Sequence, residues 1–327
     1  MRQMRGEASR RSFIKNTSLV AGGVASTAFG LRSSFAAERE RGAQERATSP
    51  AARFAHLIAR GEPLMAPGAF EVLTARMIEM IGFEAAVVGG SAVSANGYGV
   101  PDHGLVSVSE LIEFSSRIAQ SVDIPVMADA DDCGGSPIAV YRAVQAFERG
   151  GVASVMIEDH VQAKHLGSTG RLVPVEEMAN KVRAAVDARR DQHFMIIARA
   201  DALSIGLTKS EALDRGAAYA AAGADMLFFA GLNQEEIPAV AEEIKRPLMT
   251  TVSDTPLAEL RDNQVSLAVY ASHAVSAAMG AAYEALKELK QSGKVSSVAP
   301  LSRDIQSDLI RTKESIEKGI KYGLVRE

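Results

Sequence analysis

Short apolar runs and amphipathic segments alternate along most of this chain. Eight of the runs have the length of strands that are buried on both faces of a parallel sheet, at 64–66, 85–88, 124–128, 154–157, 195–198, 226–229, 248–251 and 267–270. Helical segments are predicted near 70–81, 108–121, 137–149, 175–189, 209–222, 234–244, 256–262 and 274–291. Eight strand–helix units in about 230 residues predict a (β/α)8 barrel, a TIM barrel, rather than an open sheet.

Local signals mark the start of several predicted helices. Ser107 and Thr208 are each followed three residues later by a glutamate, which is the pattern of a capping box. Ser136 and Pro137 have the residue types of an N-cap and a first helical position. Each of these signals lies where a barrel needs a helix to begin.

The two ends of the chain differ from the predicted barrel domain, 51–298. The segment 9–15, Ser-Arg-Arg-Ser-Phe-Ile-Lys, resembles a twin-arginine export signal, and the mildly apolar stretch 19–31 is short for a membrane span. We therefore expect 1–36 to be an export signal and 37–50 a linker. The protein is then periplasmic with no stable membrane anchor after signal removal, or cytoplasmic if the signal is not used. Residues 299–327 are expected to be a helical tail, an addition to the barrel fold.

Composition narrows the class of protein. The 327 residues are 47% hydrophobic and 23% charged, which is typical of a globular chain with an ample core. A single cysteine, Cys133, excludes a disulfide within one chain and a zinc site built from several cysteines. Residues 1–36 carry six basic side chains and one acidic one, so a net charge of −4 leaves −9 on the remainder. An acidic body argues against nucleic acid as a partner.

Polar residues follow five of the predicted strands. The sets are Gly89-Gly90-Ser91 after the second strand, Asp129, Asp131 and Asp132 after the third, Glu158-Asp159-His160 after the fourth, Arg199-Ala200-Asp201 after the fifth and Ser272-His273 after the eighth. The carboxyl ends of barrel strands meet at one face, where such folds carry their chemistry. Acids gathered there repel one another, and a divalent cation with oxygen ligands would offset the repulsion. The alternative interpretation is a set of solvated turn acids.

Together with Pro101-Asp102, these motifs resemble the isocitrate lyase/phosphoenolpyruvate mutase superfamily over roughly residues 60–295. The resemblance implies that Asp129 binds Mg2+ directly, with Mn2+ as a possible substitute, and that Asp131, Glu158 and Asp102 hold its waters. It also implies that Gly89, Gly90 and Ser91 hold a substrate carboxylate and that Arg199 pairs with the reacting oxygens. The substrate implied is a small 2-oxo or 2-hydroxy acid.

Several residues of this chain differ from the family pattern, and these differences narrow the range of reactions that the resemblance implies. Lyases of this family carry a Cys-Gly-His motif after the fourth strand, whereas this chain has Leu166 and Ser168 at the Cys and His positions. His273, just after the eighth strand, resembles a histidine of the oxaloacetate decarboxylase members. The resemblance therefore favours decarboxylation of oxaloacetate to pyruvate and CO2 through a metal-stabilised enolate. Arg199, His273 and Asp102 are the expected catalytic residues, although His273 alternatively has only a local role at a helix start.

Other functions remain open. The alternatives are a methylisocitrate- or dimethylmalate-type lyase, a mutase or hydrolase that acts on a C–P bond, and a dicarboxylate-binding protein without turnover. The resemblance also implies a homodimer or homotetramer whose C-terminal helices are exchanged between subunits.

Overall fold

The computed structural model describes residues 48–161, 164 and 170–324. The predicted export signal and nearly all of the predicted linker lie outside these residues. Within the described part of the chain, no helix is both long enough and apolar enough to cross a bilayer.

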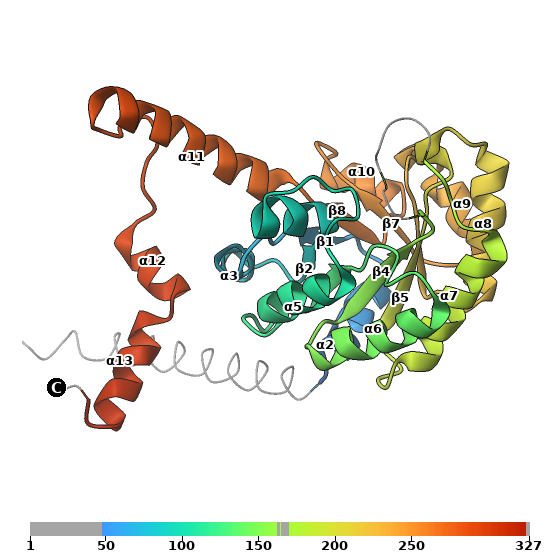
Figure 1. Ribbon diagram of the computed structural model, residues 1–327, viewed down its shortest axis with the longest axis horizontal. Helices are drawn as coiled ribbons and strands as arrows, with labels where there is room; N and C mark the ends of the chain where they lie inside the picture. Colours follow the sequence, from blue (N-terminus) through green and yellow to red (C-terminus); the bar gives the residue numbers. More distant parts are fainter. Residues whose placement is uncertain (1–47, 162–163, 165–169, 325–327) are drawn as a thin grey trace, which may run out of the picture. The chain divides into compact units, whose positions relative to one another are not determined.

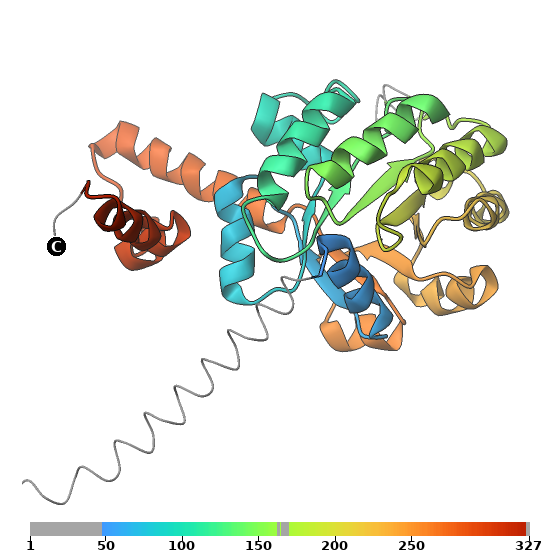
Figure 2. The ribbon, with the colours of Figure 1, turned by 90° about the horizontal axis from the view of Figure 1, so that it is seen from below.

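Eight parallel strands form the centre of the molecule (Figure 1). They are β1 (Leu64–Pro67), β2 (Ala86–Val88), β3 (Val126–Asp129), β4 (Ser154–Glu158), β5 (Met195–Ala200), β6 (Met226–Phe229), β7 (Leu248–Thr251) and β8 (Leu267–Tyr270). Their order in the sheet is β1-β8-β7-β6-β5-β4-β3-β2, and a bridge between Gly68 and Val87 joins its two edges. The predicted (β/α)8 barrel is confirmed, because helices surround a nearly closed ring of strands (Figure 2).

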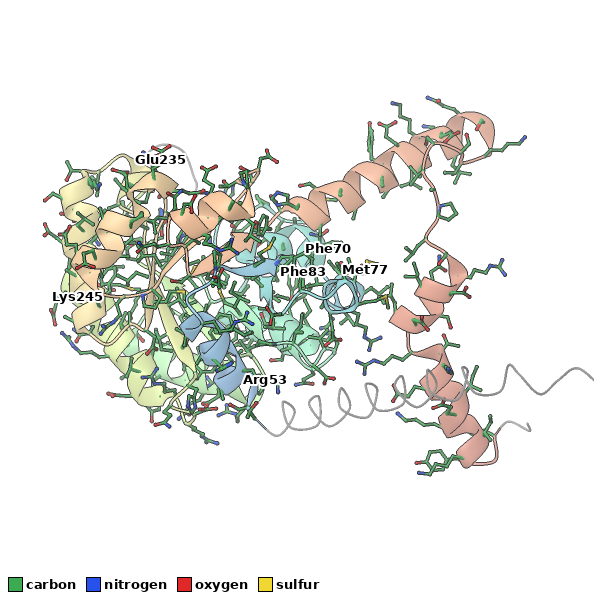
Figure 3. All side chains as sticks on the ribbon, turned by 180° about the vertical axis from the view of Figure 1, so that it is seen from behind. Arg53, Phe70, Met77, Phe83, Glu235 and Lys245 are labelled. Atoms are coloured by element: carbon green, nitrogen blue, oxygen red, sulfur yellow. The ribbon has the colours of Figure 1, made fainter. Side chains whose placement is uncertain are left out.

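The helices agree closely with the predicted segments. They are α3 (Val72–Ile81), α5 (Val108–Ala119), α6 (Pro137–Arg149), α7 (Val175–Ala188), α8 (Lys209–Ala221), α9 (Ile237–Ile244), α10 (Leu257–Asp262) and α11 (His273–Ser292). Ser107, Ser136 and Thr208 each accept a backbone N–H in the first turn of their helix, so these predicted starts are confirmed. Phe70 and Phe83, labelled in Figure 3, come just before and just after α3 in the chain.

Four elements were not predicted, and one of them is the short 3-10 helix η2 (Leu203–Ile205) after β5. Helix α2 (Pro50–Ala59) precedes the first strand, and Ser49 caps it. A short helix, α4 (Gly90–Ala92), and a π-helical segment, η1 (Val93–Tyr98), follow β2, where the sequence suggested only a glycine-rich turn. Helix α2 lacks a preceding strand to mark it, and η1 lacks the 3.6-residue period on which the prediction depended.

Alternate residues of each strand face the barrel interior. The interior cluster contains Met127 of β3, Met156 of β4 and Ile197 of β5, together with Phe54 and Leu57 of α2. Helix α2 therefore contributes its apolar side chains to the interior, and a second cluster fills the layer between strands and outer helices. Because side chains alternate along a strand, the residues two positions beyond these three point the same way.

The C-terminal segment leaves the barrel as α11 and continues as α12 (Arg303–Leu309) and α13 (Thr312–Lys321) (Figure 1). The expected helical tail is thus present in two pieces. Arg311, with φ +56°, separates the pieces because a left-handed residue interrupts a helix. Helix α12 is attached to α3, since Arg76 donates to the carbonyl of Leu309 at 2.7 Å. Met77 of α3 lies on the side toward α12 (Figure 3).

Candidate active site

Strand alternation brings three charged residues to one end of the barrel interior. Asp129, Glu158 and Arg199 each lie two positions beyond an interior residue of β3, β4 or β5. Glu158 and Arg199 are direct partners in the β4–β5 register, and Arg199 Nη1 lies 3.3 Å from Glu158 Oε2. Asp129 and Glu158 are buried. The expected convergence of these strand ends is therefore present.

Asp131 reaches the same place through a turn and not through a continuing strand. β3 ends at Asp129, and Asp131 has a left-handed backbone with φ +49°. Aspartate tolerates this conformation better than most residues. The N–H of Asp131 donates to Asp129 Oδ1 at 3.1 Å, and the N–H of Glu158 donates to the carbonyl of Asp131 at 2.9 Å. On a continuing strand, residues two apart would point the same way, but here the turn brings Asp129 and Asp131 together.

The predicted glycine-rich segment lies directly over the two aspartates. The N–H of Gly90, at the start of α4, donates to Asp129 Oδ2 at 3.2 Å. A Cβ at Gly90 would lie 2.7 Å from Asp131 Oδ1 and 3.3 Å from Asp129 Oδ2. Only glycine allows so close an approach. Gly89 is half-buried and Ser91 is exposed, so Ser91 is accessible to a ligand, whereas the N–H of Gly90 is already occupied by Asp129.

A lysine that the sequence analysis did not assign lies among the acids. The Lys164 ammonium is buried and lies 2.6 Å from Asp131 Oδ1 and 3.4 Å from both Glu158 Oε1 and Asp102 Oδ1. Asp102 therefore joins the acidic cluster from the segment between η1 and α5. The four acids and Lys164 form a site in which carboxylate oxygens surround one positive charge.

The pKa values of the site groups reflect this crowding. Burial raises the pKa of Asp131, and the charge of Asp129 raises it further, while Lys164 opposes the shift. Burial likewise raises the pKa of Glu158 against the opposing effect of Arg199 and Lys164. Burial alone would lower the pKa of Lys164, but the surrounding carboxylates outweigh it and raise that pKa. The acids therefore depend on cations for their charged form.

Three residues hold the Arg199 side chain in place: Glu158, Asp201 and Phe228. Its Nε and Nη2 donate to Asp201 Oδ1 at 3.1 and 2.7 Å, and its guanidinium carbon lies 5.5 Å from the centre of the Phe228 ring. The side chain keeps 14% of its surface exposed. A fixed guanidinium that is still partly accessible suits bidentate binding of a carboxylate.

The residues fit a divalent cation. Asp102 Oδ1 and Glu158 Oε2 are buried carboxylate oxygens that accept no hydrogen bond within the described residues and have only the longer ion pairs with Lys164 and Arg199. Oxygen donors of this kind are what Mg2+ and Mn2+ prefer. Over the same residues, no three Asp, Glu, His or Cys side chains come close enough to bind a metal directly. Mg2+ usually keeps several of its waters and is bound through one or two carboxylates, so one direct carboxylate, Asp129, with water-mediated contacts from the others would suit it.

Two other residues discussed from the sequence lie outside this cluster. His273 is exposed at the start of α11; its Nε2 lies 2.6 Å from the carbonyl oxygen of Ser253, and its ring packs edge-on against Tyr270. None of the contacts found for His273 in the described residues reaches the acids, and its catalytic role remains a prediction. Cys133 is fully buried, and burial raises the pKa of its thiol, so it is not available as a nucleophile.

Three residues of possible functional importance, Lys164, Arg215 and Tyr219, were not identified from the sequence. Lys164 lies two residues before Leu166, in the segment that lacks the lyase cysteine, and no sequence pattern assigned it a role. Arg215 and Tyr219 of α8 reach Asp159, at the end of β4, from the outer layer of the barrel. Their spacing of four residues, which puts both on one face of a helix, was the only available signal.

The fold and the site together define a class of protein: a (β/α)8-barrel enzyme with an acidic, cation-suited site at the carboxyl ends of its strands. Comparison with known proteins gives the family. The family model for phosphoenolpyruvate phosphomutase matches residues 54–290. The chain belongs to this family, within the PEP mutase/isocitrate lyase superfamily, and is an enzyme of the lyase class.

Named relatives act on several small acids. The chain is 33% identical to 2-methylisocitrate lyase of Salmonella typhimurium over 84% of this chain and 93% of the relative. It is 35% identical to oxaloacetate decarboxylase of Pseudomonas putida, over 72% and 82%. It is 40% identical to 2,3-dimethylmalate lyase of Eubacterium barkeri, but there the match spans 60% of this chain and 66% of the relative. These relatives support a lyase that acts on a small dicarboxylate.

A solved structure adds a chemical detail. Phosphonopyruvate hydrolase in complex with oxalate and Mg2+ matches with a TM-score of 0.75 and 29% identity, over 85% of this chain and the whole of the other. A member of the same fold thus accommodates a small dicarboxylate together with magnesium.

Proposed function

We propose that this protein is a Mg2+-dependent lyase that decarboxylates oxaloacetate to pyruvate. The observation that carries the proposal is the convergence of Asp102, Asp129, Asp131 and Glu158 next to the guanidinium of Arg199. This arrangement provides oxygen ligands for a cation and a fixed partner for a carboxylate in one place. Bound Mg2+ would supply Lewis-acid polarisation of the 2-oxo group.

The chain's own residues have separate roles in this proposal. Asp129 would bind the cation directly, and Asp131, Glu158 and Asp102 would hold its waters. Arg199 and the N–H and hydroxyl of Ser91, next to Gly90, would hold and orient the substrate. The C3–C4 bond breaks, CO2 leaves, the electron pair moves toward the 2-oxo group, and C3 then gains a proton. His273, from the end of β8, is the proposed source of that proton.

Cleavage of a 2-hydroxy acid is the second candidate, because two of the named relatives are lyases of that kind. The products distinguish the two. Oxaloacetate decarboxylation gives pyruvate and CO2, whereas cleavage of a 2-hydroxy acid between C2 and C3 gives a 2-oxo acid and a second carboxylic acid. Leu166 and Ser168, at the positions of the lyase cysteine and histidine, favour decarboxylation.

The test is a product assay on the chain without residues 1–36. Oxaloacetate, 2-methylisocitrate and 2,3-dimethylmalate are supplied separately with Mg2+, and CO2 and all organic acids are quantified against the metal's own background. Pyruvate and CO2 in equal amounts from oxaloacetate, lost with EDTA, support the proposal. Turnover of a 2-hydroxy acid alone supports the second candidate. Oxalate-induced thermal stabilisation without any turnover indicates a binding protein.

Lys164 should weaken metal binding. Its ammonium lies close to three of the four acids, and a unit charge at such a distance opposes an incoming cation by a few kcal/mol at an effective dielectric of about 20. We expect Lys164→Met to bind Mg2+ at least about tenfold more tightly in calorimetric titration, a gain of about 1.4 kcal/mol. Lys209→Met, which removes an exposed lysine of α8, is the control and should change nothing. Unchanged or weaker binding in Lys164→Met would contradict the expectation.

We also propose that the protein works as a homodimer or homotetramer. None of the 20 residues of α11 is buried, and Met279, Tyr283, Leu286 and Leu289 are between 47% and 67% exposed. A single helix with an uncovered apolar face is marginal in water, so it needs a partner surface. A second copy of the chain is the proposed partner, in agreement with the assembly that the family resemblance implies.

Charge placed on the apolar face of α11 should dissociate this assembly. The double variant Tyr283→Glu/Leu286→Glu is expected to elute as a monomer in size-exclusion chromatography with light scattering. Lys287→Glu/Lys290→Glu adds acidic residues to the same helix at polar positions and should keep the parent's mass. A parent that is monomeric at micromolar concentration would exclude the proposal.

A further inference from the structure

A buried polar network connects the outer helix α8 to the end of β4. The Asp159 carboxylate is fully buried, and its Oδ2 accepts the Tyr219 hydroxyl at 2.6 Å and Arg215 Nη1 at 3.1 Å. Its Oδ1 accepts the N–H of Asp201 at 2.9 Å. Tyr219 is itself fully buried. Three donors from two elements therefore fix the position of one carboxylate.

The network continues from Asp159 to the arginine of the site. The N–H that Asp159 holds belongs to Asp201, and Asp201 Oδ1 in turn accepts Nε and Nη2 of Arg199. The N–H of Asp159 also donates to the carbonyl of Arg199 at 3.3 Å. Asp159 thus holds both the backbone of Arg199 and the residue that fixes its guanidinium.

The same network holds the segment that leads into α7. Arg215 Nη1 donates to the carbonyl of Val173 at 3.0 Å, and the N–H of Val173 donates to the carbonyl of Asp159 at 2.9 Å. The ends of β4 and β5 and the start of α7 are therefore fixed relative to one another by side chains of α8.

Attachment of α8 to the barrel does not require this network. Replacing a buried ionic group by well-packed apolar residues is often neutral or stabilising, so a buried ion pair is weak evidence for a role in stability. α8 already packs apolar residues such as Ala212 and Ala220 against the strands. The polar contacts instead determine a single orientation of Asp201 and Arg199.

We propose that Tyr219 and Arg215 are positioning residues, which hold Arg199 through Asp159 and Asp201 in the orientation that binds the substrate carboxylate. The inference depends on the carboxylate-binding role given to Arg199 in the proposed function. In this proposal, the outer helix α8 determines the orientation of Arg199, although the side chains of α8 do not contact the substrate.

The first test measures binding of oxalate, a simple dicarboxylate, to the Mg2+-loaded chain by calorimetry. Tyr219→Phe removes one hydroxyl and should weaken oxalate binding about tenfold, while Mg2+ affinity stays within twofold of the parent. Ile118→Val, at a buried position of α5, is the control for a general loss of packing and should leave oxalate binding unchanged. Arg215→Lys is a second variant, which keeps the charge but not the several contacts of the guanidinium.

A double-mutant cycle separates positioning from a general structural effect. If Tyr219 acts through Arg199, Tyr219→Phe should cause no further loss of oxalate affinity in an Arg199→Met background. An equal loss in both backgrounds, or no loss in either, overturns the inference. Because oxalate binding needs no turnover, an absence of oxaloacetate decarboxylation would overturn the proposed reaction and leave this test intact.

Discussion

Asp129→Asn should lose cation binding and at least about a thousandfold of the activity, while the barrel stays folded. Both Asp129 oxygens already accept backbone N–H groups, from Gly90 and Asp131, so the carboxylate is fixed and each oxygen still has acceptor capacity for a cation. An amide at this position removes a negative charge and presents an NH2 group to at least one of those donors. A metal supplies several kcal/mol of stabilisation in such a site, and about 4 kcal/mol corresponds to a thousandfold in rate.

The matched control is Asp132→Asn, three residues along the same turn. Asp132 is buried to the same degree as Asp129, but its Oδ1 accepts the N–H of Gly134 within the turn. The asparagine oxygen can accept the same N–H, so this variant should keep its affinity for Mg2+. Mn2+ binding followed by electron paramagnetic resonance, together with the thermal midpoint, measures both effects. Comparable losses in the two variants would mean that buried charge in general, and not a ligand at Asp129, supports the site.

The positions of the strands could be predicted from the sequence because each strand is an apolar run bounded by polar residues. Six of the eight predicted strands agree with the observed bounds to within one residue at both ends. Of the other two, 195–198 ends two residues early, and 124–128 begins two residues early, at Ile124 and Pro125. Proline has no N–H for a sheet ladder, so the strand can begin only after it. The positions of Asp129, Glu158 and Arg199 followed from the same strand ends.

Other parts of the site depend on contacts between distant segments, and no local pattern encodes them. Lys164 comes from a connecting segment with neither strand nor helix periodicity, and its position is determined by acids up to 62 positions earlier in the chain. Arg215 and Tyr219 lie in an alanine-rich helix whose apolar pattern alone suggests simple packing. Asp131 reaches the site by a left-handed backbone, which the strand period does not predict.

Gly90→Ala should weaken cation binding by about tenfold to a hundredfold without unfolding the chain. Its added Cβ would lie 2.7 Å from Asp131 Oδ1, and this carboxylate cannot easily retreat because Lys164 holds the same oxygen at 2.6 Å. The second aspartate, Asp129, would meet the Cβ at 3.3 Å. The methyl group must therefore displace the two carboxylates or α4 itself. Overpacking of this kind typically costs about 1–3 kcal/mol, which acts here on the ligand positions.

The neighbouring glycine provides the comparison that makes this prediction specific. A Cβ at Gly89 would approach no atom more closely than 3.9 Å, and its φ of −87° suits any residue. Gly89→Ala should therefore bind Mn2+ with the parent's affinity, whereas Gly90→Ala should not. Both variants lose the same backbone freedom of a glycine, so a difference between them must come from contact with the carboxylates. If both bind Mn2+ equally well, the acids have enough room to adjust, and the close approach of α4 to Asp129 and Asp131 is not required for the cation site.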